Sequence, residues 1–116
     1  MKHNRKFGSI RKELATKARE SMLSAVQIYN NPNIQFKSET FIVLSIIAWT
    51  YLIHAYYKAK GIDYCYYSKY PNGRKKYDKT KYGAKKRWEL ERCLNDRNCP
   101  FDSVTKENLT FFIAVR

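Results

Sequence analysis

The spacing of apolar positions divides the chain into helical stretches separated by short polar breaks. From Ser9 to Tyr29 apolar residues recur every three or four positions, which predicts an amphipathic helix capped by Ser9. Asn30, Asn31 and Pro32 follow, and proline cannot continue the helical hydrogen-bond ladder. We therefore expect the first helix to end at Tyr29.

A second and longer helix is predicted from Ser38, as its N-cap, to Lys60, with Gly61 closing its end. Residues 40–57 of this helix contain no Asp, Glu, Lys or Arg, which is just long enough for a membrane span. We interpret the segment as a buried central helix instead, because polar residues such as His54 interrupt it and a core helix is also apolar all round. A span at 40–57 is the alternative, which detergent-free solubility of the purified chain would exclude.

The pattern changes between residues 62 and 82, where tyrosines alternate with lysines and arginines. Pro71-Asn72-Gly73 is typical of a type I turn, and tyrosine-rich flanks favour strands. This segment is predicted to form a short β-hairpin or an extended loop.

The remaining residues predict two more helices. One covers about Lys81 to Asn95, and the other begins at Asp102 or Ser103 after a loop at 96–100. The apolar run 109–116 has no Gly, Asn or Pro to stop it, so we expect a domain truncated at its C-terminus. The predicted fold is mainly α, a bundle of about four helices with a Tyr/Lys-rich loop or short β-hairpin between the second and third.

Charge is concentrated in two blocks. The chain has 116 residues and a net charge of +13, of which residues 1–19 carry +6 and residues 69–87 carry +8. We expect residues 1–19 to form a basic N-terminal arm and the start of the first helix, and residues 20–116 to form the helical domain. Clustered positive charge creates a field that attracts polyanions such as RNA. A solvated face that only keeps the protein soluble is the alternative.

Composition excludes several classes of protein. Three cysteines without C-x-x-C spacing argue against a disulfide scaffold and a zinc module, and no glycine-rich phosphate loop is present. We therefore expect reduced thiols in a cytoplasmic protein, with no metal and no small-molecule cofactor. Residues 1–8 have no apolar core of a secretory signal.

The Tyr/Lys-rich block carries the clearest chemistry. Single-stranded nucleic acids are bound by aromatic faces that stack on bases and by cations that follow the phosphates, and this block supplies both. The alternative is that its tyrosines cover the helical core while its lysines stay in water. The residues predicted to bind nucleic acid are Lys69, Arg74, Lys75, Lys76, Lys79, Lys81, Lys85, Lys86, Arg87, Tyr66, Tyr70 and Tyr77. His54 is more simply explained as a hydrogen-bonded core histidine than as a catalytic one.

Several motifs in fixed order resemble a prokaryotic family. They are Ser24-Ala-Val-Gln-Ile-Tyr-Asn-Asn-Pro32, Ile34-Gln-Phe-Lys37, Phe41-Ile-Val-Leu-Ser-Ile-Ile-Ala-Trp49, Gly61-Ile-Asp-Tyr-Cys-Tyr-Tyr67 and Trp88-Glu-Leu-Glu-Arg-Cys-Leu-Asn95. Over about residues 20–116 they resemble a domain-of-unknown-function family that is thought to be HEPN-like.

The resemblance implies an all-α bundle that is often dimeric, and in some members a metal-independent endoribonuclease of phage defence or toxin–antitoxin systems. Active HEPN enzymes carry an Arg followed four to six residues later by a His on the last helix. Arg116 matches that Arg and is the candidate catalytic residue, whereas the matching His would lie beyond residue 116. On the central helix, Thr50 and His54 stand where relatives tend to carry Glu and Lys.

Three hypotheses follow. The first is an RNA-binding helical protein without activity of its own, and the second is a ribonuclease completed by a His beyond Arg116. The third is a protein–protein interaction or dimerisation module. A gel with labelled RNA separates the three, because the first predicts retention, the second cleavage and the third neither.

Overall fold

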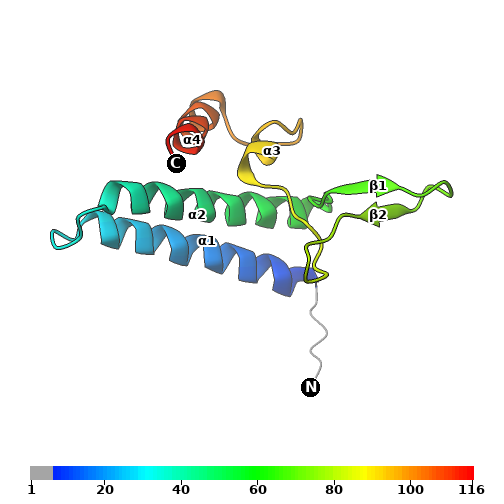
Figure 1. Cartoon of the computed structure of the whole chain (residues 1–116), viewed down its shortest axis with the longest axis horizontal. Coiled ribbons are helices and arrows are strands. Elements are labelled where there is room, and N and C mark those ends of the chain that lie inside the picture. The colour runs from blue at the N-terminus through cyan, green and yellow to red at the C-terminus, as the bar shows by residue number, and fades with distance from the viewer. Residues whose placement is uncertain (1–6) are drawn as a thin grey trace, which may run out of the picture.

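The computed structural model describes residues 7–116 as a helical body with a projecting β-hairpin (Figure 1). The long helices α1 (Phe7–Tyr29) and α2 (Lys37–Lys60) lie antiparallel and side by side. The short helix α3 and the helix α4 lie on the side of α2 away from α1, and the hairpin extends beyond the C-terminal end of α2. The other elements are β1 (Tyr67–Lys69), β2 (Lys75–Tyr77), α3 (Leu90–Leu94) and α4 (Ser103–Val115). The predicted fold class is confirmed.

The ends of the first two helices agree with the sequence prediction better than their starts. The α1 helix ends at Tyr29 and α2 at Lys60, both as predicted, and Gly61 closes α2 with a φ of 71°, the left-handed conformation that glycine adopts without strain. The predicted N-caps are wrong. Ser9 lies inside α1, which already begins at Phe7, and α2 begins at Lys37 because the Thr40 N–H already bonds to the Phe36 carbonyl at 3.2 Å.

The helix α2 is the centre of the hydrophobic core. Ile53 and Tyr57 are fully buried, and the Tyr57 ring meets Trp88 edge-on at a centroid distance of 5.8 Å. The Tyr57 hydroxyl donates a hydrogen bond to the Cys93 carbonyl at 3.1 Å, so α2 is tied to α3. By length and composition alone α2 would also be able to cross a membrane. Its contacts with Trp88 and Cys93 are those of a core helix.

The predicted third helix is wrong over most of its length. Only residues 90–94 are helical, and the chain from 84 to 88 is extended. Its backbone is occupied elsewhere, since the Trp88 N–H bonds to the Tyr64 carbonyl at 2.8 Å and the Lys86 N–H to the Asp78 carbonyl at 2.9 Å. A backbone that pairs with a neighbouring strand cannot also form a helix.

The last helix begins where the sequence predicts. The Asp102 carboxylate accepts a hydrogen bond from the Thr105 N–H at 2.8 Å, which is the geometry of an N-cap. Leu109 is buried against the core, and Phe112 meets Phe41 of α2 edge-on. The three cysteines are free thiols.

Candidate nucleic-acid interface

Residues 64–88, here called the Tyr/Lys arm, are organised by a three-way junction of backbone hydrogen bonds. The Tyr66 N–H donates to the Lys86 carbonyl at 2.9 Å, and the Lys86 N–H donates to the Asp78 carbonyl at 2.9 Å. The Asp78 N–H closes the ring on the Tyr66 carbonyl at 3.0 Å. Three extended segments are thereby held together, although only β1 and β2 form a regular ladder.

Two tight turns form the tips of the arm. The first is the predicted turn at Pro71–Gly73, where the Gly73 N–H bonds to the Tyr70 carbonyl at 2.9 Å. The second lies at residues 80–83, where the Gly83 N–H bonds to the Thr80 carbonyl at 3.0 Å. Gly73 and Gly83 have φ angles of 85° and 87°, which other residues rarely adopt. The sequence prediction missed the second turn and placed helix there instead.

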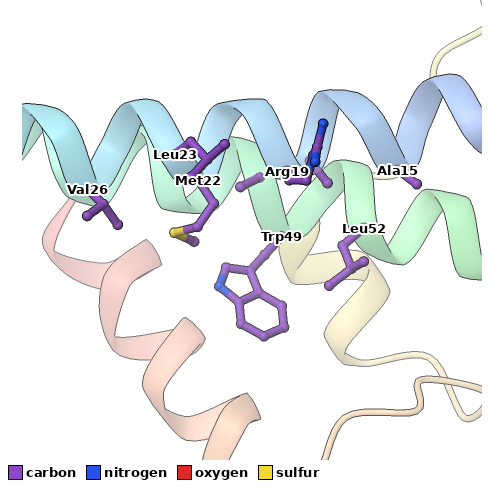
Figure 2. Close-up of a pocket in the computed structure, with 9 residues that line it drawn as sticks. Ala15, Arg19, Met22, Leu23, Val26, Trp49 and Leu52 are labelled. Atoms are coloured by element: carbon purple, nitrogen blue, oxygen red, sulfur yellow. The ribbon is translucent and has the colours of Figure 1, made fainter.

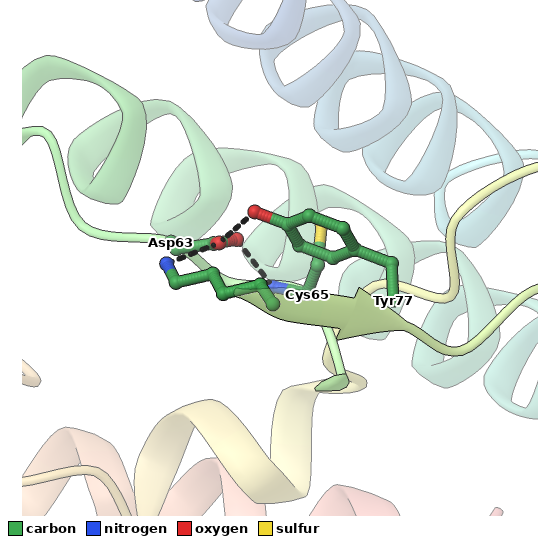
Figure 3. A network of polar contacts seen from close by, with 4 residues as sticks. Asp63, Cys65 and Tyr77 are labelled. Carbon is green, nitrogen blue, oxygen red and sulfur yellow. Dashed lines mark hydrogen bonds and ion pairs between the residues drawn. The ribbon is translucent and has the colours of Figure 1, made fainter. Parts of the chain in front are cut away.

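Asp63 holds the arm at its base (Figure 3). Its carboxylate accepts hydrogen bonds from the Tyr77 hydroxyl at 2.6 Å, the Lys75 ammonium at 2.8 Å and the Cys65 N–H at 3.1 Å. Burial by itself raises the pKa of Asp63, but these hydrogen bonds outweigh it and hold the pKa below its usual range. The carboxylate therefore links the connection after α2 to strand β2.

A second carboxylate contact fastens the arm to the start of α3. The Tyr66 hydroxyl donates to Glu89 at 2.7 Å, and burial together with this carboxylate raises the pKa of Tyr66 to about 12. Tyr66 is half-buried, so its hydroxyl and part of its ring serve the fold. Of the three predicted stacking tyrosines, Tyr66 and Tyr77 both bond to acidic residues at the base of the arm.

We expect Asp63→Asn to loosen the arm and to lower the free energy of unfolding by about 1–2 kcal/mol at pH 7. Because the folded-state pKa of Asp63 is depressed, its contribution is present above about pH 4 and is lost as the pH falls through the folded pKa. Urea unfolding at pH 7 and pH 3 measures this, and the difference between wild type and variant should shrink at pH 3. Asp78→Asn, at an exposed arm position, is the control. If Asp63→Asn has the same free energy of unfolding as wild type at pH 7, Asp63 does not anchor the arm.

The cations of the arm face one another across the ladder. Lys69 lies directly opposite Lys75 in the β1–β2 register, and Lys79 lies opposite Lys85 in an isolated bridge. Like charges in directly opposed positions destabilise a sheet. All nine predicted basic residues lie on the arm and are exposed: Lys69, Arg74, Lys75, Lys76, Lys79, Lys81, Lys85, Lys86 and Arg87. Asp63 offsets the charge of Lys75, so the uncompensated like-charge pair of the arm is Lys79–Lys85.

The exposed tyrosines of the arm differ from those predicted to stack on bases. Tyr70 is 47% exposed, as the sequence prediction requires, but Tyr67 is 41% and Tyr82 85% exposed, and neither was in the predicted set. Lysine ammonium groups stand near all three rings, with Lys75 4.7 Å from the Tyr67 centroid and Lys81 5.1 Å from Tyr82. The sequence signal that could have placed Tyr82 at a turn is its position immediately before Gly83.

The candidate catalytic residue lies away from the arm tips. Arg116, just after α4, is exposed and lines a cavity of about 350 Å³ together with His54 and Arg87. His54 is buried, its Nε2 lies 2.8 Å from the Trp88 carbonyl, and its ring stacks on Tyr64 at 4.5 Å. The predicted hydrogen-bonded core histidine is thus confirmed, while the cavity that it shares with Arg116 was not predicted.

Protonation of His54 should destabilise the fold. Burial lowers the pKa of His54, the Trp88 hydrogen bond opposes this shift and the charge of Arg87 adds to it. The neutral form stabilises the folded state above about pH 6.5, and that contribution falls as the pH drops from there toward the lower folded pKa. In this window wild type should lose up to about 1.4 kcal/mol per pH unit more than His54→Gln. Urea unfolding of both proteins between pH 7.5 and 5 checks this. The same dependence of the unfolding free energy on pH in wild type and variant would contradict it.

The comparisons with known proteins identify the family. A family model for a domain of unknown function, DUF3644, matches residues 13–116. The chain belongs to the DUF3644 family. No curated protein and no solved structure matches this DUF3644 chain. The described residues contain no group of three or more His, Cys, Asp or Glu side chains placed to hold a metal ion.

Proposed function

We propose that this DUF3644 chain binds single-stranded RNA through the Tyr/Lys arm. The observation that carries the proposal is the density of exposed cations on one short arm, including the directly opposed pair Lys79–Lys85. Like charges held this close together cost stability, and a polyanion that binds there neutralises them. Exposed tyrosines beside the same lysines add faces on which bases stack.

The arm is pre-organised for this task. Its hydrogen-bonded junction and the Asp63 anchor hold the backbone that carries the lysines before RNA arrives, so little backbone entropy is lost on binding. Phosphates follow the lysines, and bases stack on Tyr70 and Tyr82 near the two tips and on Tyr67 in β1. Stacking and phosphate contacts do not depend on the identity of the base, so sequence preference should be weak.

The salt dependence of binding tests the proposal. Fluorescence anisotropy with a labelled, unstructured RNA should give a slope of log affinity against log salt near −4, if about six phosphates are contacted. A mixed-sequence DNA strand and a heparin fragment serve as comparison polyanions. Absence of binding at low salt, or affinity that does not change with salt, would contradict RNA binding by the arm.

A metal-independent endoribonuclease is the second candidate function. The observation that favours it is the cavity shared by Arg116, Arg87 and His54, because RNA cleavage needs a cation on the phosphate and a group that moves the 2′-OH proton. With Nε2 on the Trp88 carbonyl, Nδ1 is the nitrogen left to take a proton. Gel analysis of labelled RNA with EDTA tests it. Cleavage that Arg116→Ala and His54→Gln both abolish would support the enzyme, and retention without cleavage would support binding alone.

Under the HEPN-like resemblance, this RNA binding belongs to cytoplasmic phage defence or toxin–antitoxin systems and the protein is a homodimer. Light scattering on the purified chain tests the dimer separately from RNA binding. A dimer that neither retains nor cleaves RNA would favour an interaction module over both functions.

A further inference from the structure

A long apolar groove runs along the α1–α2 pair, away from the arm tips. Two adjoining cavities of about 400 and 380 Å³ share Ala15 and Leu52, so they form one depression. Figure 2 shows Ala15 and Val26 of α1 well apart along it, with Trp49 and Leu52 contributed by α2. From residue 11 to residue 26 the groove follows α1 for about 22 Å, or four helical turns. We call it the α1–α2 groove.

Small residues make the floor of the groove, and larger apolar residues make its walls. Ala18, Ala48 and Ala55 are buried in the floor. Leu23, Val26 and Leu52 line it and are between 43% and 53% exposed. Exposure of leucine and valine to water is unfavourable, so covering this surface would release free energy. Trp49 and Phe101, packed edge-on at 5.1 Å, close the side toward α4.

The rim of the groove is basic and carries no acid. Arg11, Lys12 and Arg19 line it, whereas no Asp or Glu is among its lining residues. The two acidic residues of α1, Glu13 and Glu20, lie outside the lining, and Glu13 forms an ion pair with Lys17. An occupant therefore needs an apolar face together with negative charge.

We propose that the α1–α2 groove binds an acidic amphipathic helix of a partner protein. A straight, concave groove of about four turns fits one helix, whose apolar residues at every third or fourth position enter between the alanines. Acidic residues on the flanks of that helix meet Arg11, Lys12 and Arg19.

Charge and shape disfavour other occupants. A second copy of this chain brings a net charge of +13 toward a basic rim, and its own exposed apolar helix, α4, carries Lys106 and Glu107 rather than an acidic flank. An anionic bilayer surface is flat and cannot follow a concave groove walled by Pro100 and Phe101. RNA offers phosphates but no continuous apolar face for Leu23 and Leu52.

The probe for the test is a designed helical peptide of about 16 residues, with leucines on one face and glutamates on its flanks. A scrambled peptide of the same composition and a peptide with lysine for glutamate are the controls. Trp49 lines the groove and the chain's other tryptophan, Trp88, is buried in the core, so tryptophan fluorescence should shift to the blue as the peptide binds. Both control peptides should bind at least about tenfold more weakly.

Matched variants locate the binding. Leu52→Asp and Arg19→Glu in the groove should each weaken the acidic peptide about tenfold or more. Val43→Asp, at a similarly exposed position of α2 outside the lining, and Arg97→Glu, in an exposed loop, should leave affinity unchanged. Far-UV circular dichroism confirms that each variant is folded.

Several results would overturn the proposal. They are equal binding of scrambled and acidic peptides, affinity unaffected by Leu52→Asp and Arg19→Glu, or a dimer that Leu52→Asp dissociates. Binding of RNA or anionic vesicles through the groove without peptide binding would also overturn it. Because the arm is separate, a variant with its lysines replaced should keep full peptide affinity, which distinguishes failure here from failure of RNA binding.

Discussion

We expect alanine at four arm lysines to remove most of the salt dependence of RNA binding. The four are Lys69, Lys76, Lys79 and Lys86, all exposed. Lys75 and Lys85 are left intact, because Lys75 bonds to Asp63 and Lys85 lies 3.8 Å from the Tyr77 centroid, so their loss would also disturb the arm. The slope of log affinity against log salt should fall from about −4 to about −1.5, as four of about six phosphate contacts disappear.

The two slopes lead to a large difference in measurable affinity. Between 50 and 200 mM salt, wild type should lose about 250-fold in affinity and the variant less than about tenfold. The matched control removes the same number of charges outside the arm, through alanine at Lys37, Lys60, Arg97 and Lys106. If the control variant loses as much affinity as the arm variant, RNA responds to net charge and not to the arm.

Replacement of Tyr57 by alanine should have the largest effect on stability. Tyr57 is fully buried, packs edge-on against Trp88 and donates its hydroxyl to the Cys93 carbonyl. Removing a buried aromatic ring costs about 3–5 kcal/mol, because the surrounding side chains fill the cavity only in part. For a domain with about 5–15 kcal/mol of total stability this brings the chain near its unfolding threshold. Urea unfolding with tryptophan fluorescence measures the change.

Two variants separate the parts of the Tyr57 effect. Tyr57→Phe keeps the ring and removes the hydrogen bond to Cys93, and should cost about 1 kcal/mol. Tyr70→Ala, at an exposed arm tyrosine, should change stability by less than about 0.5 kcal/mol. A Tyr57→Ala variant as stable as Tyr70→Ala would show that α2, Trp88 and α3 do not form one core.

Local signals in the sequence were enough for most of the helical body. Pro32 ends α1, Gly61 closes α2 and Asp102 caps α4, because each acts on hydrogen bonds within a few residues of itself. The predicted starts of α1 and α2 were wrong, because Ser9 and Ser38 lie inside the first turns of these helices. The hairpin turn at Pro71–Gly73 was likewise local.

The extended conformation of residues 84–88 was not predictable from the local sequence. Residues 84–88 are rich in lysine and arginine, which suit a helix, yet their backbone pairs with Tyr64, Tyr66 and Asp78. Asp78 lies eight residues before Lys86, but Tyr64 and Tyr66 come twenty or more residues before the residues they pair with, so a short window around residue 86 does not contain them. Tertiary pairing overrode helix propensity here.

By itself, the sequence determined the mainly helical class, the central helix and the concentration of charge in two blocks, one of them rich in tyrosine. These depend on composition and on spacing along the chain, which folding does not alter. Only the tertiary structure decided which tyrosines stay exposed, that His54 and Arg116 line one cavity, and that basic side chains rim an apolar groove. Each of these depends on residues far apart in sequence meeting in space, and their meeting is set by packing against α2 rather than by any local preference.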